Sequence, residues 1–265
     1  MNYVKAKKNL GQHFLKDLNI AKTIVESLSG DNELVLEVGP GMGVLSEFLF
    51  QEKKYQTYLI EIDRESIEFL NKKYPENKDH IFSGDFLKMD INDFSRGKKI
   101  SVIGNFPYNI SSQIFFKVLE NRHIVAEVVG MLQKEVAERI ASGPGSKEYG
   151  ILSVLLQAFY TVEYLFTVHE HVFSPPPKVK SAVIRVKRND VTNLGCDEIL
   201  FKKVVKTSFN QRRKMLRNSL KSICIMNDLD HPFMEKRPEQ LSVKDFVELT
   251  NILDSRQLFV KCSEI

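Results

Sequence analysis

The segment Asn105-Phe-Pro-Tyr108 combines residue types that suit chemistry on a nucleobase amine. The exocyclic amine of adenine is a poor nucleophile because its lone pair is delocalised into the ring. If the Asn105 side-chain oxygen and a backbone carbonyl of the Phe106-Pro107 turn accept its two N–H groups, the lone pair becomes localised on nitrogen. Tyr108 offers a face on which a flipped-out base can stack, worth about 1–3 kcal/mol. The segment predicts a site for N-alkylation of a base, with a plain strand-end turn as the alternative.

A second chemical signal is an apolar strand that runs straight into three alternating glycines. Leu34–Val38 is followed by Gly39, Gly41 and Gly43. Glycines are needed where a backbone turns sharply or approaches a ligand closely. The spacing does not match the Gly-x-Gly-x-x-Gly of dinucleotide-binding loops. It is Glu-x-Gly-x-Gly-x-Gly, which resembles motif I of the class I S-adenosylmethionine (SAM) methyltransferases, although a tightly packed turn would give the same glycines.

Carboxylates stand at the ends of the next two predicted strands. Glu61 lies near the end of the strand Thr57–Ile62, where a βαβ unit places an acid that accepts both hydroxyls of a ribose. Asp63 suits a helix N-cap better, so we assign Glu61 to a ribose and Asp63 to a structural role. Asp85 follows a strand that begins at His80 and can accept from the adenine amine of a cofactor. A turn aspartate is the alternative for Asp85.

These groups must be positioned by strands that alternate with helices. Strands are predicted at residues 34–38, 57–62, 80–86, 99–104, 125–132, 164–168 and 181–187, and helices at 19–28, 110–119, 136–140 and 151–159. The alternation predicts a doubly wound parallel sheet, closed by an antiparallel hairpin of the last two strands. This is an α/β fold that resembles the Rossmann-like class I SAM methyltransferases.

The chain divides after this sheet. Residues 189–195 are polar and turn-rich, and the pattern beyond them is purely helical. We therefore predict a methyltransferase domain of residues 1–188, which includes a basic N-terminal arm. A small, basic, all-α domain of residues 196–265 would follow it.

The composition is that of an ordinary globular protein. The chain of 265 residues is 43% apolar and 27% charged, and no apolar run reaches the roughly 20 residues that span a bilayer. The N-terminus lacks the apolar core of a secretory signal. Cys196, Cys224 and Cys262 lack metal-ligand spacing, and the six histidines form no metal constellation. We expect a cytoplasmic protein with reduced thiols, no metal site and no membrane contact.

The net charge is only +4, but the cations are unevenly distributed. The stretch from Ile199 to Asn227 contains no acid. If it is one helix, all of its cations but Arg212 fall within an arc of about 120°. A break near Asn210-Gln211 would rotate the second half and weaken this geometry, though not the charge count. Solvated helix faces normally mix both signs, so we favour RNA binding over that alternative. The cations assigned to RNA are Lys206, Arg213, Lys214 and Arg217.

With these residues placed, the sequence resembles the bacterial small-subunit rRNA adenine N6,N6-dimethyltransferases, within the rRNA adenine dimethylase family. The resemblance covers nearly the whole chain and includes the segments Gly11–Leu15, Leu132–Val136, Phe173–Val179 and Phe209–Lys214. It implies SAM as cofactor, bound by His13, Leu15, Gly39, Gly41, Gly43, Glu61, Asp85 and Asn105. It implies catalytic roles for Asn105, Pro107, Tyr108 and Phe173, with Tyr108 and Phe173 sandwiching the target base.

The resemblance also implies a substrate and a partner. The family methylates two neighbouring adenosines in a hairpin near the 3′ end of small-subunit (16S) rRNA, and each receives two methyl groups. We therefore expect immature small ribosomal subunits as the partner of a monomeric enzyme. Two residues depart from the family pattern, because His13 stands where Asn is usual and Phe106 where Leu is usual.

Three alternative functions compete with this one. A large-subunit rRNA dimethylase of the macrolide-resistance type shares the catalytic motifs, but the match at Phe209–Lys214 argues against it. A non-catalytic RNA-binding factor on the same fold would not need the intact Asn105–Tyr108 motif. A small-molecule methyltransferase would not need the basic C-terminal stretch.

Overall fold

The computed structural model describes residues 4–225, 230–256 and 258. The chain forms two compact units, one of residues 1–137 and 161–188 and the other of residues 138–160 and 189–265. The second unit takes in residues 138–160, which the sequence-based division places in the first domain. Asn227 and Cys262, named above, lie outside the described residues.

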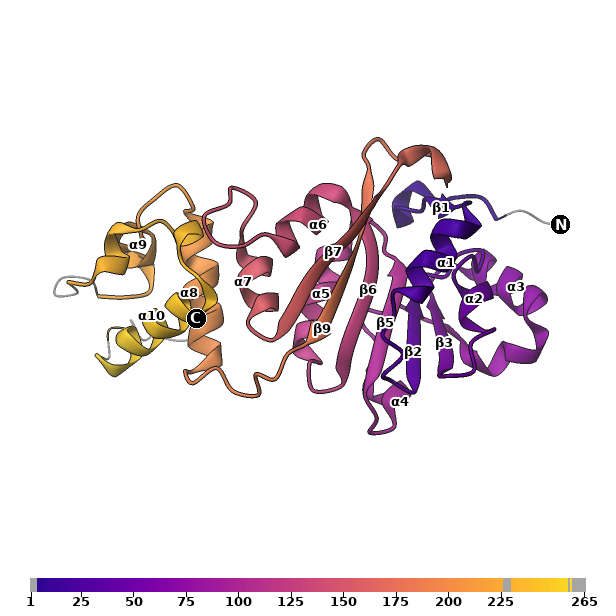
Figure 1. The fold of residues 1–265 in the computed structure, drawn as a ribbon, viewed down its shortest axis with the longest axis horizontal. Helices are drawn as coiled ribbons and strands as arrows, with labels where there is room; N and C mark the ends of the chain where they lie inside the picture. The colour runs from indigo at the N-terminus through magenta and orange to yellow at the C-terminus, as the bar shows by residue number, and fades with distance from the viewer. Residues whose placement is uncertain (1–3, 226–229, 257, 259–265) are drawn as a thin grey trace. The chain divides into compact units, whose positions relative to one another are not determined.

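The first unit is built around a seven-stranded sheet (Figure 1). Its strands lie in the order β4 (Ile81–Ser83), β3 (Gln56–Glu61), β2 (Leu34–Val38), β5 (Ile100–Asn105), β6 (Val125–Gln133), β9 (Ser181–Arg188) and β7 (Tyr160–Val168). Neighbours from β4 to β6 are parallel, and β9 runs antiparallel to β6. All five residues of β2 are buried, as expected for a central parallel strand. The predicted doubly wound sheet with antiparallel C-terminal strands is confirmed.

The order of the strands reverses between β2 and β5. From β2 the chain proceeds outward through β3 to β4, then returns to β5 on the other side of β2 and continues to β6. In an open α/β sheet, ligands bind at such a switch point, in the crevice outside the carboxyl ends of the strands. The residues that follow β2, β3, β4 and β5 therefore meet at one edge of the sheet.

Helices α1 (Leu18–Glu26) and α2 (Ser46–Leu49) pack with the sheet through one apolar cluster. Asp17 caps α1 by accepting from two backbone N–H groups. The cluster joins both helices to β2, β5 and β6, and its buried members include Ile24, Leu49, Val35, Ile103 and Val129. The other helices that follow strands of the sheet are α3 (Arg64–Lys73), α4 (Asn92–Ser95), α5 (Ser111–Glu120) and α6 (Lys134–Ala141), the last of which spans the boundary of the two units.

A two-stranded sheet holds the N-terminal arm. β1 (Phe14–Leu15) pairs antiparallel with β8 (Phe173–Ser174), so that Leu15 lies opposite Phe173. Both side chains belong to the apolar cluster of α1 and α2, with Leu15 3% and Phe173 1% exposed. The pairing anchors the arm to the segment that precedes the proline-rich turn.

The second unit is helical. Its helices are α7 (Ile151–Gln157), α8 (Glu198–Asn210), α9 (Leu216–Ser219) and α10 (Val243–Ser255). Asp197 caps α8 and Ser242 caps α10. In the core, the Phe209 ring lies 6.1 Å from Tyr149 and 5.9 Å from Phe246, measured between centroids. Aromatic packing of this kind holds α8 and α10 together.

The described residues of the basic stretch from Ile199 do not form one helix, and the break lies near Asn210-Gln211, where the sequence analysis left one open. α8 ends at Asn210, and α9 begins only at Leu216. Gln211 leaves the helical region, with φ −121° and ψ 46°. The turn changes the direction of the chain, so the cations do not share one helical arc.

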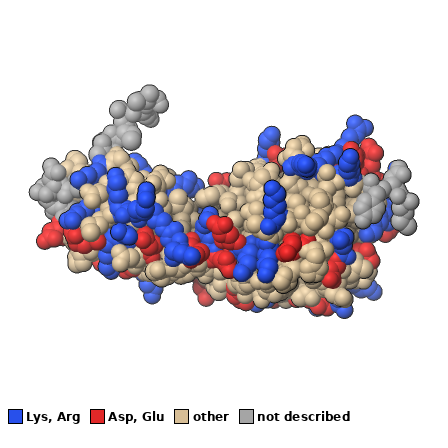
Figure 2. Space-filling view, turned by 90° about the horizontal axis from the view of Figure 1, so that it is seen from above, with Lys and Arg blue, Asp and Glu red and all other residues tan. Residues whose placement is uncertain are grey.

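The cations of this stretch have different surroundings. The Arg212 guanidinium donates to the Ser146 carbonyl at 3.1 Å. Arg217 pairs with Glu235 at 2.6 Å. The side chains of Lys206, Arg213 and Lys214 are exposed. Figure 2 shows Lys and Arg side chains gathered over the second unit, with acidic side chains among them.

The described residues hold neither a membrane span nor a metal cluster. No helix in them is both long and apolar enough to cross a bilayer. No group of three or more His, Cys, Asp or Glu side chains in this part of the chain is placed to hold a metal ion. Cys196 and Cys224 are free thiols, and burial raises the pKa of Cys224 to about 11.

Candidate active site

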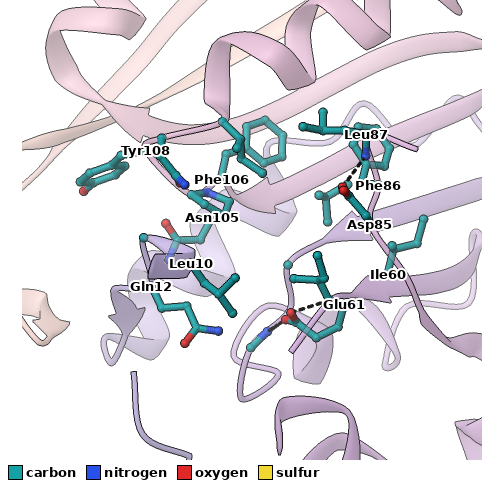
Figure 3. A pocket seen from close by; sticks show the side chains of 18 of the residues that line it. Leu10, Gln12, Ile60, Glu61, Asp85, Phe86, Leu87, Asn105, Phe106 and Tyr108 are labelled. Carbon is teal, nitrogen blue, oxygen red and sulfur yellow. Dashed lines mark hydrogen bonds between the residues drawn. The ribbon is translucent and has the colours of Figure 1, made fainter. Parts of the chain in front are cut away.

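A pocket lies where the strand order reverses (Figure 3). Its walls come from the ends of β2, β3, β4 and β5 and from residues 9–14 of the arm. The predicted site residues that line it are His13, Gly39, Gly41, Glu61, Asp85, Asn105, Pro107 and Tyr108. The predicted residues outside the lining are Leu15, Gly43 and Phe173. The fold thus brings most of the predicted cofactor and catalytic residues together.

The first two glycines of the loop shape the pocket, and the third supports the fold. Gly39 and Gly41 have φ values of 69° and 56°, in the left-handed region that favours glycine. A Cβ on Gly41 would lie 2.8 Å from the Phe14 ring. A Cβ on Gly43 would instead lie 2.9 Å from Tyr74, whose hydroxyl donates to the Gly43 carbonyl at 2.9 Å. Gly43 therefore lets the loop pack against the end of α3.

Glu61 is a buried carboxylate at the end of β3, only 4% exposed. One oxygen accepts from the Gly41 N–H at 2.9 Å, and the other accepts from the N–H groups of Ile62 and Asp63 at 2.8 and 2.9 Å. Burial raises the pKa of Glu61, and the backbone hydrogen bonds oppose this shift. The contacts tie the glycine loop to β3 and hold an acceptor in the pocket wall. Ribose binding by Glu61 stays a prediction.

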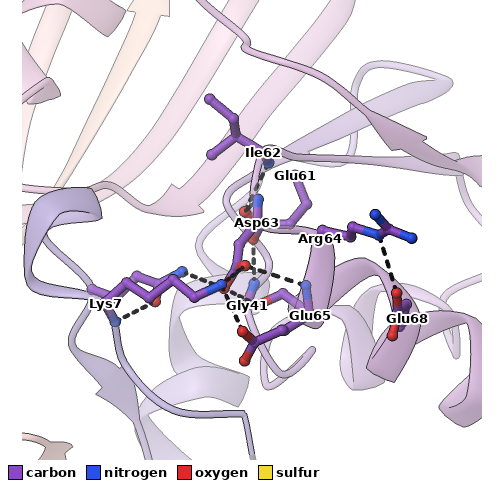
Figure 4. Close-up of polar contacts among 10 residues, drawn as sticks. Lys7, Gly41, Glu61, Ile62, Asp63, Arg64, Glu65 and Glu68 are labelled. Atoms are coloured by element: carbon purple, nitrogen blue, oxygen red, sulfur yellow. Dashed lines mark hydrogen bonds and ion pairs between the residues drawn. The ribbon is translucent and has the colours of Figure 1, made fainter.

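Asp63 is structural, as predicted, and also fastens the N-terminal arm. It caps α3 by accepting from the Glu65 N–H at 3.2 Å. Lys7 Nζ lies 2.5 Å from one carboxylate oxygen (Figure 4). Gln12 Nε2 donates to the other at 3.2 Å. Burial would raise the pKa of Asp63, but the hydrogen bonds from Lys7 and Gln12 outweigh it and lower the pKa. No local pattern signals this clamp, because Lys7 and Asp63 are 56 positions apart.

Asp85 lies in the pocket lining and also acts as a turn aspartate. It lines the pocket just after β4. One of its oxygens also accepts from the Leu87 N–H at 3.0 Å, as a turn aspartate does. The turn thus holds the carboxylate at the pocket rim, and its contact with an adenine amine stays a prediction.

Two apolar side chains line the pocket at positions that the sequence analysis does not single out. Ile62 is 54% exposed and lines the pocket next to Glu61, and Phe86 follows Asp85 in the same lining. Apolar residues beyond strand ends are common and cannot be singled out from one sequence. In the fold they supply apolar surface of the kind that a flat aromatic ring covers.

The orientation of the Asn105 amide is fixed by the arm. Its Nδ2 donates to the His13 carbonyl at 2.8 Å. Because a carbonyl can only accept, the amide nitrogen must face His13 and the amide oxygen remains as an acceptor. Within the described part of the chain, no donor reaches that oxygen. Asn105 therefore presents the group that can accept from a target amine.

The backbone hydrogen bonds of the Asn105–Tyr108 motif indicate which carbonyl can be the second acceptor for a target amine. The Pro107 carbonyl already accepts from the Ile110 N–H at 3.1 Å. The Phe106 N–H donates to the Met131 carbonyl at 2.9 Å, which anchors the motif to β6. Among the described residues the Phe106 carbonyl has no donor, so it is the better candidate for the second acceptor.

Two glycines make room for Phe106, one of the two residues that depart from the family pattern. Gly104 of β5 lies opposite Gly130 of β6. A Cβ would lie 2.9 Å from the Phe106 ring at Gly104 and 2.4 Å from it at Gly130. The buried ring also meets Phe115 edge-on, with 5.9 Å between centroids. The space left by the two glycines therefore accommodates the ring of the larger side chain.

The sandwich of a target base between Tyr108 and Phe173 stays a prediction. Phe173 is buried because the pairing of β1 with β8 places it in the apolar cluster. Leu15, its partner in that pairing, is buried in the same way. The Tyr108 ring stacks on the His13 imidazole, at 5.3 Å between ring centroids. Burial raises the pKa of Tyr108, and its hydrogen bond with Ser181 opposes the shift.

The chain is similar to known proteins over nearly its whole length. Residues 3–255 match the model of a family described as ribosomal RNA adenine dimethylase. The chain is 60% identical over 257 residues to the ribosomal RNA small subunit methyltransferase A of Bacteroides thetaiotaomicron, covering 95% of each chain. It is 59% identical over 259 residues to the protein of the same name from Cytophaga hutchinsonii, covering 97% of this chain and 100% of the relative.

Solved structures share the fold. The crystal structure of a dimethyladenosine transferase from Plasmodium falciparum matches with a TM-score of 0.76 at 25% identity, covering 93% of this chain and 99% of that one. The crystal structure of the 23S rRNA methyltransferase ErmE matches with a TM-score of 0.66 at 23% identity, covering 90% of this chain and 99% of that one. The arrangement of sheet and helices is therefore that of class I SAM methyltransferases with added C-terminal helices.

Proposed function

The chain belongs to the ribosomal RNA adenine dimethylase family, and on this premise we propose that it transfers methyl groups from SAM to the N6 amines of adenosines in small-subunit rRNA. The observation that carries the proposal is the fixed Asn105 amide, whose oxygen is left as an acceptor in the pocket. Relatives that share more than half of its residues are named for the small subunit.

The pocket fits SAM. Gly39 and Gly41 allow the loop backbone to approach a ligand closely, and Glu61 provides a buried carboxylate for ribose hydroxyls. Asp85 accepts from the adenine amine, and Ile62 offers an apolar surface to the adenine ring. SAM supplies a methyl group that its sulfonium already activates, so positioning accounts for most of the rate.

The protein's own groups prepare the target amine. The Asn105 side-chain oxygen and the Phe106 carbonyl accept the two N–H groups of the adenine amine and localise its lone pair on nitrogen. Tyr108 supplies a stacking face for the extruded base. The His13 carbonyl keeps the Asn105 amide from turning over, because only the amide nitrogen can donate to it.

The proposed position of the methylated adenosines in the rRNA follows from the resemblance of the sequence to the family. We propose two neighbouring adenosines in a hairpin near the 3′ end of small-subunit rRNA, each dimethylated during assembly of the subunit in the cytoplasm. A large-subunit substrate has less support, because the likeness to ErmE, at 23% identity, is one of fold. A monomeric enzyme stays a prediction.

Cations of the second unit are proposed to contact the rRNA backbone. Lys206, Arg213 and Lys214 have exposed side chains that can reach phosphates. Arg217 is held by Glu235 at 2.6 Å, so it contributes less than the sequence alone indicates. Such contacts give affinity without sequence specificity and weaken as salt rises.

The test is transfer of labelled methyl from SAM to immature small subunits, to large subunits and to free adenosine. We expect label in small subunits alone. Because N6,N6-dimethyladenosine cannot form a Watson–Crick pair, reverse transcription should stop at the two modified positions. Label in large subunits only, or in none of the three substrates, would contradict the proposal.

Matched variants tie the activity to the pocket. Asn105→Ala should reduce the single-turnover rate by about 10²-fold or more, since it removes a hydrogen-bond partner of the reacting group. Asn77→Ala is the control, because it removes the same type of side chain at a position outside the pocket lining. An equal loss of rate in both variants would contradict the role of Asn105.

A further inference from the structure

A short turn after β4 forms the part of the pocket wall to which the cofactor adenine is assigned. Residues 84–87 line the pocket at this point (Figure 3). The Asp85 carboxylate accepts from the Leu87 N–H at 3.0 Å, and the Asp85 carbonyl accepts from the N–H groups of Lys88 and Met89 at 2.9 and 3.0 Å. The direction of the Asp85 carboxylate therefore depends on how this turn is held against the rest of the fold.

Lys117 of α5 holds the turn from outside the pocket lining. Its ammonium donates to the Leu87 carbonyl at 3.0 Å and to the Met89 carbonyl at 2.5 Å. The Nζ atom also lies 5.7 Å from the centroid of the Phe86 ring, which is buried. Hydrogen bonds from a charged donor are stronger than neutral ones, and a cation is attracted to the face of an aromatic ring. One side chain thus fastens three residues of the turn.

The contact is not that of an ordinary surface lysine. A lysine that serves only solubility keeps its ammonium in water, with its stem along the surface. The Lys117 side chain is half-buried, and its ammonium is directed at carbonyls that lie 30 and 28 positions away in the chain. The contact therefore ties two distant segments of the first unit together.

The helix that carries Lys117 is also attached to the catalytic motif. α5 begins at Ser111, whose hydroxyl donates to the Tyr108 carbonyl at 3.3 Å. Just before the helix, the Ile110 N–H donates to the Pro107 carbonyl at 3.1 Å. Lys117 lies at the other end, in the last turn of α5. The helix therefore connects the motif assigned to the target amine with the turn assigned to the cofactor.

Building on the proposed function, we propose that Lys117 is a positioning residue for SAM. It fixes the turn of residues 85–89 before the cofactor arrives, so that the Asp85 carboxylate already faces the adenine amine. Binding then does not have to order the turn, and preorganisation of this kind raises affinity. Because the contact is made from α5, it also fixes the cofactor wall relative to the Asn105–Tyr108 motif.

Calorimetry of SAM binding tests the proposal with three variants. Lys117→Met keeps the aliphatic stem but removes the ammonium, and should raise the Kd for SAM about tenfold. Lys117→Arg keeps a cation with several donors and should stay within about threefold of wild type. Lys72→Met is the control, because it removes an exposed lysine from the last turn of α3, and it should bind SAM as wild type does. In single-turnover methylation, the rate of Lys117→Met at saturating SAM should fall less than its SAM affinity, since Asn105 is left in place.

A double-mutant cycle with Asp85→Asn tests whether the effect passes through Asp85. Asparagine can still accept from the Leu87 N–H, so the turn is kept, but it lacks the charge that the adenine amine would meet. In this background Lys117→Met should raise the Kd by less than about threefold, because the group that it positions is already altered. A further increase of about tenfold, equal to that in the wild-type background, would overturn the proposal.

Hydrogen exchange of the protein without SAM reports on the turn itself. The Leu87, Lys88 and Met89 amides, which bond to Asp85, should exchange faster in Lys117→Met than in wild type or Lys72→Met. Equal exchange in all three proteins would mean that Lys117 does not hold the turn, and the proposal would be wrong. Lys117→Gln, which also lacks the charge, decides the matter if Lys117→Met does not fold.

The outcomes separate this inference from the proposed function. If wild type binds SAM but methylates no small subunit, the proposed function fails, and the SAM affinities still decide the role of Lys117. If wild type methylates small subunits and Lys117→Met binds SAM as tightly as wild type, the proposed function stands and the inference is overturned. If wild type does not bind SAM, both are overturned.

Discussion

Glu37 should make the stability of the sheet depend on pH, and Glu37→Gln should remove that dependence. Glu37 lies in β2 at the centre of the sheet and is 1% exposed. Burial raises its pKa from 4.5 to about 8, the proximity of Glu61 adds to the shift, and a hydrogen bond from the Ser46 hydroxyl at 2.6 Å opposes it. At neutral pH the folded protein therefore keeps a proton on Glu37 that the unfolded chain has lost.

The sign and size of this pH dependence follow from the linkage between proton binding and unfolding. The folded-state pKa is raised, so the stabilisation is fully present below the unfolded pKa of 4.5 and is lost as pH rises to about 8. In that window the loss is about 1.4 kcal/mol per pH unit, or about 2.7 kcal/mol between about pH 5.5 and about pH 7.5. Glutamine has nearly the same shape as glutamate and cannot ionise, so the Glu37→Gln protein does not lose this stability as the pH rises.

The measurement is urea denaturation of full-length protein followed by circular dichroism at these two pH values. The free energy of unfolding of Glu37→Gln relative to wild type should rise by about 2.7 kcal/mol from the lower to the higher pH. Glu52→Gln removes the same charge from an exposed side chain, and its difference from wild type should change far less. A Glu37→Gln difference that does not change with pH would refute the reasoning. It would mean that Glu37 ionises in the sheet as easily as it does in water.

Three further changes test the site and the proposed RNA surface. Glu61→Gln should weaken SAM binding by about 1.5–3 kcal/mol in calorimetry. The substitution removes the charged acceptor, and the NH₂ group of the new glutamine side chain would face a backbone N–H that needs an acceptor. Gly130→Ala should lower the free energy of unfolding by about 1–3 kcal/mol, since its Cβ would lie 2.4 Å from the Phe106 ring, and adding Phe106→Leu should restore part of the loss. Arg213→Glu with Lys214→Glu should weaken small-subunit binding and flatten its salt dependence by about one to two units of log–log slope.

Each of these variants has a control and a contradicting result. Unchanged SAM affinity in a folded Glu61→Gln protein would remove this residue from the proposed cofactor site. If Phe106→Leu did not offset Gly130→Ala, the ring would not be the cause of the lost stability. For the RNA surface, Lys53→Glu with Lys54→Glu changes the same charge at exposed positions of the first unit, and equal weakening by both pairs would indicate a general charge effect.

The sheet and the glycine loop could be predicted because their signals are local. β2 has the bounds that its apolar run predicts, and its exit carries glycines with positive φ. The acid Glu61 reaches the pocket because parallel strands end at the same edge, so the position in the strand alone places it. The same logic places Asn105 at the end of β5.

The features that the sequence leaves open depend on contacts between distant segments. Nothing between Phe209 and Leu216 is a glycine or a proline, so the sequence allows a break near Asn210-Gln211 but does not fix it. The turn is stabilised by the bond from Arg212 to Ser146, which are 66 positions apart. Phe173 has the residue type of a stacking side chain, but its pairing with Leu15 buries it.

The N-terminal arm is the element whose function its sequence least reveals. Its lysines suggest attraction to RNA, yet Lys7 binds Asp63, two positions after the carboxylate proposed to hold the ribose. A few residues later, the His13 carbonyl fixes the amide of Asn105. One short segment therefore contacts both the proposed cofactor side and the proposed target side of the pocket. Because Lys7 and His13 belong to the same short segment, a displacement of the arm must disturb both contacts together. It follows that a substitution of Lys7, although remote from the target base, should affect methyl transfer through Asn105 as well as through cofactor binding.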